Sequence, residues 1–256
     1  MMKLDLQKEL TEQLEIEEVF SFNIGNVKVG FDEATVVSWI IIAVLTVLAI
    51  ILTRNLKVTG EISKRQAILE MLYEKAEDFF KGIMGEKVEK FIPWLMSMGL
   101  FIGISNIIGL FGMKPPTKSI QVTGVMAITS IVLVEYCAFK EKGVGGRLKA
   151  LTKPIAIITP INIMEVFTKP LSLCMRLFGN VIGAFTIMEL IKAIIPVGLP
   201  VVFSLYFDIF DGLLQAYIFV FLTALYLQEA VESDEDEPKK KSRKKLRKAG
   251  KKKLEA

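Results

Sequence analysis

Five stretches of mostly apolar residues, separated by shorter polar segments, dominate this chain of 256 residues. They cover about residues 34–53, 91–112, 119–139, 154–195 and 201–231. A helix of about 20 apolar residues crosses the hydrocarbon layer of a bilayer, so each stretch is long enough to span it. The pattern predicts an all-α integral membrane protein with about five membrane-crossing segments.

The fourth stretch, 154–195, is much longer than one crossing requires and contains no clear soluble loop. It is consistent with a helical hairpin, or with one very long tilted helix that breaks near Pro160 or Pro170. A turn rich in proline and glycine at 196–200 then leads into the fifth stretch.

The polar segments predict further elements. Residues 1–33 are polar and contain a β-like patch, SFNIGNVKVGF, at 21–31. Apolar residues recur among many charges over 61–90, which predicts an amphipathic helix on the cytoplasmic membrane surface. An ordinary packing or interface helix fits that segment at least as well. A glycine-rich, basic loop is expected at 141–153.

Charges beside the apolar stretches predict the orientation. Asp32 and Glu33 precede the first stretch, whereas Arg54 follows it. Because basic flanks favour the cytoplasm, the N-terminal segment 1–33 is expected outside the membrane. Five crossings then place the C-terminal tail, 232–256, in the cytoplasm.

The tail carries the most uneven charge distribution of the chain. Positions 239–253 hold 11 Lys or Arg and no acid. Such a run beside membrane helices marks the cytoplasmic face more often than a nucleic-acid site, so no nucleic-acid partner is expected. The tail is low in complexity and is expected to be disordered, with anionic lipid or another subunit as its contact.

Composition narrows the chemistry. Hydrophobic residues make up 52% of the chain, and histidine is absent from it. The commonest metal ligand is therefore missing, and the two cysteines, Cys137 and Cys174, lie in apolar runs that favour buried thiols over a disulfide or metal site. We expect neither a metal nor a cofactor. The sequence also lacks the phosphate-binding loop that an ATP site would need.

Ionisable residues interrupt the last two apolar stretches. They are Glu165, Lys169, Arg176, Glu189, Lys192, Asp208 and Asp211. Arg176 is the clearest functional candidate, because an arginine stays charged and a charge at mid-membrane costs about 2.5–3.5 kcal/mol on insertion scales. A purely structural pairing with Asp208 or Asp211 would be an expensive way to hold two helices together.

Helical spacing groups these residues into faces. One polar stripe with small residues consists of Glu165, Lys169, Ser172, Arg176, Asn180 and Gly183. Phe185, Glu189 and Lys192 lie on a second side of the same helix. In the last stretch Asp208, Asp211 and Gln215 share a face, and Tyr226 lies three turns beyond Gln215.

Simpler interpretations exist for several of these residues. Lys169 and Lys192 can extend to opposite membrane interfaces, and Glu189 can pair with Lys192 at i and i+3. Asp211 can be the hydrogen-bonded partner of a neighbour, and Tyr226 can be an interfacial aromatic residue.

Two segments resemble a known family. KPLSLCMRLFGNVIGAF, at Lys169–Phe185, and LLQAYIFVFLTALYL, at Leu213–Leu227, resemble the signatures of the a subunit of F-type ATP synthases. The segments SNIIGLF and TPIN and the five-crossing layout also agree. The resemblance covers about residues 34–231.

The resemblance implies a function and an architecture. The chain would be the stator subunit of the F0 sector, with two long tilted C-terminal helices that form a hairpin against a ring of c subunits. Arg176 would face the ring and separate two aqueous half-channels. Asn180 and Gln215 match the family pattern directly, and Ser172 and Tyr226 match as well. Asp208 would belong to the outer half-channel.

This sequence departs from the family at Phe185, where many members carry an ionisable residue. We hypothesise that Glu189, one turn further along the same side, takes over its function. The alternative is that Asp208 and water suffice.

The resemblance also implies the setting. Expected partners are the c-subunit ring, the b-subunit peripheral stalk, the whole F1F0 complex and the lipid bilayer, in a bacterial plasma membrane. The translocated ion would be H⁺, with Na⁺ as the alternative, and the subunit would not be an enzyme on its own. A stand-alone secondary ion transporter or channel is the competing hypothesis, but its expected inverted repeats are not visible.

Overall fold

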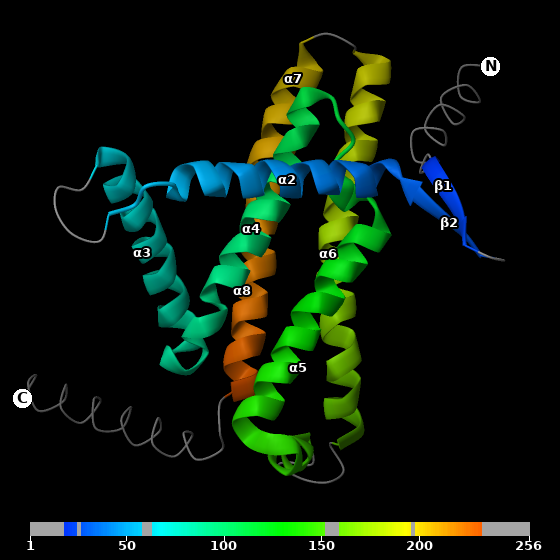
Figure 1. Cartoon of the computed structure of the whole chain (residues 1–256). Coiled ribbons are helices and arrows are strands. Elements are labelled where there is room, and N and C mark those ends of the chain that lie inside the picture. Colours follow the sequence, from blue (N-terminus) through cyan, green and yellow to red (C-terminus); the bar gives the residue numbers. More distant parts are fainter. Residues whose placement is uncertain (1–17, 25–26, 58–62, 152–158, 196–197, 232–256) are drawn as a thin grey trace, which may run out of the picture.

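The computed structural model describes residues 18–24, 27–57, 63–151, 159–195 and 198–231 (Figure 1). Its described part is almost entirely helical, apart from a β-hairpin near the N-terminus. The remaining parts of the predicted N-terminal segment and the predicted tail, 1–17 and 232–256, lie outside the described residues.

Within the described ranges, five helical segments are long and apolar enough to cross a membrane, which confirms the predicted all-α membrane fold class. Their main helices are α2 (Glu33–Thr53), α4 (Ile92–Ile107), α5 (Ile120–Leu151), α6 (Thr159–Ile194) and α8 (Gly212–Val231). Short 3-10 helices, η1 (Glu86–Phe91) and η2 (Ile108–Phe111), extend α4 at its two ends. The last span begins with α7 (Leu199–Ser204) and the π-helix η5 (Leu205–Asp211).

From Thr159 onward the fourth apolar stretch forms one helix, so its described part contains neither an internal hairpin nor a break at Pro170. Helix α6 runs through Pro170 for 36 residues. At about 1.5 Å per residue it is about 54 Å long, whereas the hydrocarbon layer is about 30 Å thick. Such a helix must tilt strongly or project from the bilayer. Residues 154–158 of the predicted stretch lie outside the described part.

Helices α4, α5, α6 and α8 form the main bundle, in which α8 packs on α4 and α5 while α6 packs chiefly on α5 (Figure 1). Its core holds large apolar side chains that are fully buried, including Ile92, Leu95, Ile102, Leu173, Leu177 and Leu227. Helix α6 buries one face, with Leu173, Leu177 and Val181, and leaves much of the rest uncovered.

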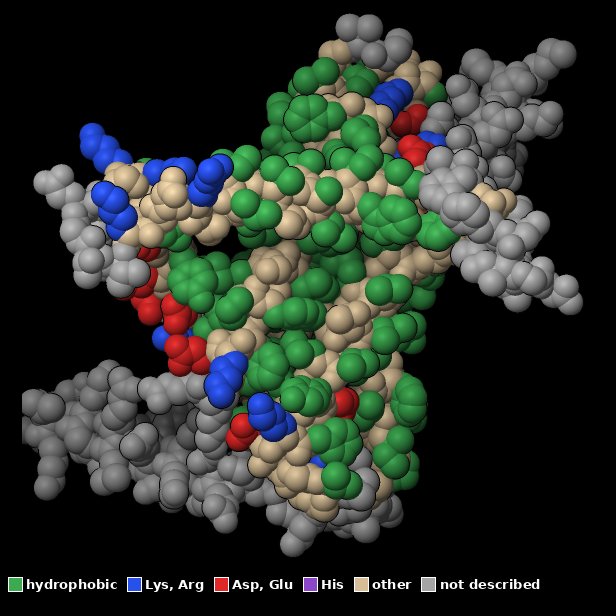
Figure 2. All heavy atoms as spheres, in the orientation of Figure 1, with side chains coloured by type: hydrophobic (Ala, Val, Ile, Leu, Met, Phe, Trp, Pro, Cys, Tyr) green, Lys and Arg blue, Asp and Glu red, His purple; other side chains and the backbone are tan. Residues whose placement is uncertain are grey.

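Helix α2 crosses this bundle at a steep angle (Figure 1). It buries only Val37, Ser38 and Ile41, and an apolar cavity of about 810 Å³ separates it from α4 and α5. Figure 2 shows hydrophobic side chains over most of the visible face, with charged side chains towards its margins. This distribution is the one expected of a protein that lies in a bilayer.

The predicted β-like patch forms an antiparallel hairpin of β1 (Glu18–Ile24) and β2 (Val27–Asp32). Helix α2 starts directly after it. The Asp32 carboxylate accepts a hydrogen bond from the Thr35 hydroxyl in the first turn of α2. This contact at the N-terminus of the helix joins the hairpin firmly to α2.

The helix predicted over 61–90 is present but shorter, and its position on the cytoplasmic membrane surface stays a prediction. Helix α3 (Lys64–Met84) ends at Gly85, whose φ of 76° suits glycine, and η1 follows. Its C-terminal end packs inward through Phe80 and Met84, and Phe79 contacts Tyr217 of α8 with ring centres 5.9 Å apart. Ile68 and Leu72, nearer its start, stay exposed. The helix therefore packs on the bundle at its C-terminal end and keeps an uncovered apolar surface along the rest.

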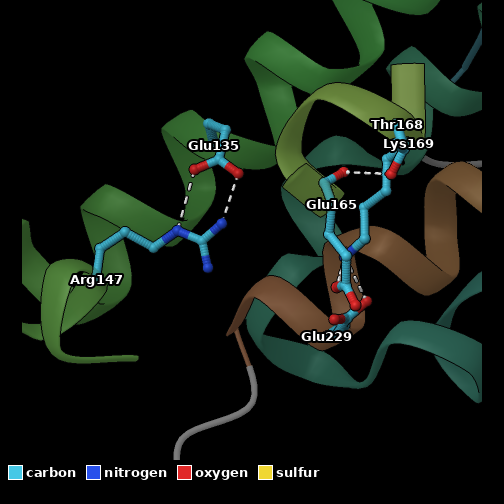
Figure 3. A network of polar contacts seen from close by, with 6 residues as sticks. All are labelled: Glu135, Arg147, Glu165, Thr168, Lys169 and Glu229. Carbon is cyan, nitrogen blue, oxygen red and sulfur yellow. Dashed lines mark hydrogen bonds and ion pairs between the residues drawn. The ribbon is translucent and has the colours of Figure 1, made fainter. Parts of the chain in front are cut away.

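The prediction of a glycine-rich loop at 141–153 was wrong, because the described part of this segment is helical. Helix α5 continues to Leu151 with a kink at Gly143, which has a φ of 68°. Beyond the kink, the Arg147 guanidinium donates two hydrogen bonds, of 3.0 and 2.6 Å, to the Glu135 carboxylate (Figure 3). This bidentate ion pair ties the segment after the kink back to the helix before it.

Candidate functional site

A cavity of about 570 Å³ lies among the end of α4, the second half of α6 and the π-helix η5. Its polar lining includes Asn106, Glu189, Lys192, Asp208, Asp211 and Gln215. Three of the predicted site residues therefore line one cavity: Glu189, Asp208 and Gln215. Carboxylate and amide groups in a membrane cavity can hold water by hydrogen bonds, and the carboxylates can exchange protons with it.

Asp208 projects from the π-helix towards η2. Its carboxylate accepts a hydrogen bond from the Ser204 hydroxyl, one turn earlier. It also lies against Gly109, where a Cβ atom would stand only 2.7 Å from Asp208 Oδ1. Glycine at 109 thus allows the carboxylate to approach the backbone of the neighbouring segment.

Glu189 forms an ion pair with Lys192 at 2.8 Å. The simpler interpretation of these two residues, pairing at i and i+3, therefore describes their geometry. Glu189 nevertheless lines the same cavity as Asp208, so the pairing does not remove it from the site.

Phe185 is covered by a lysine that the sequence did not indicate as a site residue. Lys118 is 9% exposed, and its ammonium lies 3.7 Å from the centre of the Phe185 ring. Burial lowers the pKa of Lys118 to about 8; the positive charge of Lys114 adds to this effect, while Glu189 and Glu33 oppose it. A cation over an aromatic face is stabilised by the ring quadrupole.

Arg176 lies outside this cavity, on an uncovered face of α6. Ser172, Arg176 and Asn180 are all exposed, and Arg176 has no hydrogen-bond or ion-pair partner within the part of the chain that the structure describes. A Cβ at Gly179 or Gly183 would meet open space. The predicted stripe is thus a free surface with small residues, which suits close approach of another helix.

A second polar group lies nearer the start of α6 and the end of α8. Figure 3 shows Lys169 extending to Glu229, at 2.8 Å, with Glu165 beside it. The Lys169 ammonium also lies 5.1 Å from the centre of the Tyr226 ring. Tyr226 therefore contacts a charged group that joins α6 to α8.

Along α6, Arg176 stands between these two polar groups. It is seven positions after Lys169 and thirteen before Glu189, which correspond to about 10 and 20 Å along a helix. A fixed cation thus separates the cavity near Glu189 from the cluster near Lys169.

Sequence reasoning missed several residues of the cavity region. Asn106 was visible only as a polar interruption of an apolar stretch, although a buried polar residue in a membrane helix is itself a signal. Lys118 and Ser204 carried no such signal, because they lie in or near segments that the sequence assigns to turns.

Both cysteines are buried and free, as predicted. Cys174 Sγ lies 3.6 Å from the Thr123 hydroxyl, within the α5–α6 contact. Neither thiol belongs to the cavity.

Comparison with known proteins identifies the family. Residues 35–228 match the family described as ATP synthase A chain. "ATP synthase subunit a 1" of Prosthecochloris aestuarii is 31% identical over 221 residues, which are 86% of this chain and 98% of that protein. "ATP synthase subunit a 2" of Acaryochloris marina is 29% identical over 77% of this chain and 85% of that protein.

A third relative, from Propionigenium modestum, carries the name "ATP synthase subunit a, sodium ion specific". It is 29% identical over 77% of this chain and 73% of that protein. The family match over 35–228 covers nearly all of the described membrane helices from α2 to α8, including Arg176 and the cavity residues. With this match and its five apolar spans, the chain belongs to the ATP synthase A chain family, the subunit a of ATP synthases.

Proposed function

We propose that this chain translocates ions as the membrane stator of a rotary ATP synthase, with Arg176 as the central residue. One observation carries the proposal. Arg176 lies on an uncovered face of α6, between a cavity with three carboxylates and a second charged cluster near the other end of the helix. A cation that finds no partner among the described residues of its own chain suits a counter-charge supplied by another subunit.

The electrostatics of an arginine suit this position. A carboxylate that approaches a fixed cation within a few ångströms has a lowered pKa and releases its proton. Arg176 would do this to each ring carboxylate in turn, and it would itself stay charged, unlike a lysine. The same charge would repel a cation that tried to pass directly between the two polar groups.

The cavity is the proposed outer half-channel. Asp208 and Glu189 would exchange protons with water there and pass them towards the ring, and the Gln215 amide would hydrogen-bond that water. The cluster of Lys169, Glu229 and Tyr226 would border the inner path. Na⁺ in place of H⁺ is the alternative ion, in line with the name of the relative from Propionigenium modestum.

The uncovered α6 face, with Ser172, Asn180, Gly179 and Gly183, would pack against the c-subunit ring. A b-subunit stalk and the F1 sector would complete the complex, which would lie in a bacterial plasma membrane with the N-terminus outside and the C-terminus in the cytoplasm. The subunit would act only within this complex and would not bind ATP.

Co-purification tests the proposal. An affinity-tagged chain extracted in mild detergent should bring with it a c-ring and a soluble ATPase head. Liposomes that contain the isolated chain should not accumulate ions. Liposomes that contain the whole complex should take up ions when ATP is added. An isolated chain that transports ions by itself would contradict the proposal and favour a secondary transporter.

A further inference from the structure

The contact between α4 and the start of α8 is built around a buried asparagine. Asn106 is 5% exposed, and its Nδ2 donates a hydrogen bond of 3.0 Å to the Gly212 carbonyl. The Thr117 hydroxyl, itself fully buried, donates a 2.7 Å hydrogen bond to Asn106 Oδ1. The second bond fixes which way the amide points, so that its N–H groups face Gly212.

In the same contact, each of the two segments has a glycine that faces a polar side chain of the other segment. A Cβ at Gly212 would stand 2.7 Å from the Cβ of Asn106, and a Cβ at Gly109 would stand 2.7 Å from Asp208 Oδ1. Each segment thus contributes one polar side chain and one glycine that receives the other's side chain. Real Cβ atoms do not approach this closely. A side chain at Gly212 would therefore push α4 and α8 apart, whereas one at Gly109 would displace the Asp208 carboxylate.

This interlock lies where the last span changes its helical geometry. The π-helix η5 ends at Asp211, and Gly212 is the first residue of α8. π-helical segments are rare and are found disproportionately at functional sites. A π-helical segment contains one residue more than the α-helical turns it replaces. If the segment became α-helical, the register would shift by one position and the preceding side chains would turn by about 100°. Asp208 and Asp211 would then leave the cavity.

We propose that Asn106 is a positioning residue, which together with Gly109 and Gly212 holds η5 in the register that directs Asp208 into the cavity. The inference rests on the proposed function, because it takes Asp208 to lie on the ion path. It assigns Asn106 no proton transfer of its own. Its hydrogen bonds act on Asp208 through the backbone of the last span.

The test is the pH profile of ATP-driven proton pumping by the whole complex in membrane vesicles, at matched complex content. Asn106→Leu preserves approximate size but removes both hydrogen bonds, and Thr117→Val removes only the one that orients the amide. We expect Asn106→Leu to lower pumping about tenfold and to move the midpoint of the pH profile. Thr117→Val should move it in the same direction by a smaller amount.

Gly109→Ala tests the second glycine contact of the interlock, because the new Cβ forces the Asp208 carboxylate to move. It should move the midpoint of the pH profile as well. Gly103→Ala is the matched control, because Gly103 lies on α4, the helix that carries Asn106. A Cβ there meets Leu213 and Ala216 at ordinary distances of 3.7 and 3.8 Å, so pumping and its profile should stay as in the wild type.

A shift of the midpoint in Asn106→Leu and Gly109→Ala, but not in Gly103→Ala, supports the proposal. If Asn106→Leu assembles and keeps the wild-type profile, at any rate of pumping, the asparagine has only a structural role and the proposal fails. If Asn106→Leu does not assemble, Thr117→Val and Gly109→Ala decide by the same criterion. A wild-type complex that does not pump would instead contradict the proposed function.

Discussion

Lys118 and Phe185, far apart in the sequence, are in direct contact, with the lysine ammonium 3.7 Å from the centre of the aromatic ring. The contact joins the turn between the second and third spans to the wall of the cavity, which Phe185 lines. Phe185 stands where the family resemblance implies an ionisable residue, and the buried Lys118 ammonium covers its ring. The charge in contact with Phe185 therefore comes from a different segment of the chain.

Lys118 gives a prediction about stability and pH. Its pKa falls from 10.5 to about 8 in the folded chain. Between these values the folded chain has released the proton while the unfolded chain still binds it, so stability rises with pH in this window. The effect is at most about 3 kcal/mol. Thermal denaturation in detergent from pH 7 to 10 should show that Lys118→Met lacks this rise relative to the wild type.

Lys140→Met, which removes an exposed amine from α5, is the control and should follow the wild-type pH dependence. Equal pH dependence of Lys118→Met and wild type would mean that Lys118 is not held in the buried position described.

The roles of two of the cavity carboxylates, Asp208 and Glu189, can be separated by substitution. Asp208→Asn should lower ATP-driven pumping about a hundredfold, because it removes a proton-exchanging group from the proposed path. If Glu189 takes over the function missing at Phe185, Glu189→Gln should have a comparable effect. Pumping that survives Glu189→Gln but not Asp208→Asn would reject the Glu189 hypothesis and leave Asp208 and water as the path.

The kink of α5 predicts a local cost. Gly143 has a φ of 68° and a ψ of 168°, a conformation that almost only glycine adopts and that costs residues with a side chain about 1–3 kcal/mol. Gly143→Ala should therefore lower the stability of the chain by about that amount, measured as the denaturation midpoint in detergent. Gly145→Ala, in the same segment but without a positive φ and with open space around it, should raise or preserve stability.

The small-residue surface of α6 predicts an effect that needs a partner. A side chain at Gly183 meets open space within this chain, so Gly183→Leu should not change its thermal stability in isolation. It should reduce recovery of the c-ring with the tagged chain, because a helix that packs on glycine cannot approach a leucine as closely. Gly82→Leu, an equally open position on α3, should leave that recovery unchanged.

The sequence predicted the features that depend on local pattern. Apolar length located the five spans, and helical spacing put Ser172, Arg176 and Asn180 on one surface. It could not predict the register of η5, because that depends on how Asn106 meets Gly212 across the bundle. The contact of Lys118 with Phe185 was hidden for the same reason. The loop expected around Gly143 was wrong because the Arg147–Glu135 pair supports a kinked helix there.

The most direct test of the central claim is ATP-driven proton pumping by complexes that carry Arg176→Ala, compared with Arg54→Ala as a control with an exposed arginine outside α6. Arg176→Ala should assemble normally, since Arg176 has no partner within the described part of the chain, and should pump at least about a hundredfold more slowly than the wild type. Arg54→Ala should pump normally. Wild-type pumping by an assembled Arg176→Ala complex would contradict the account.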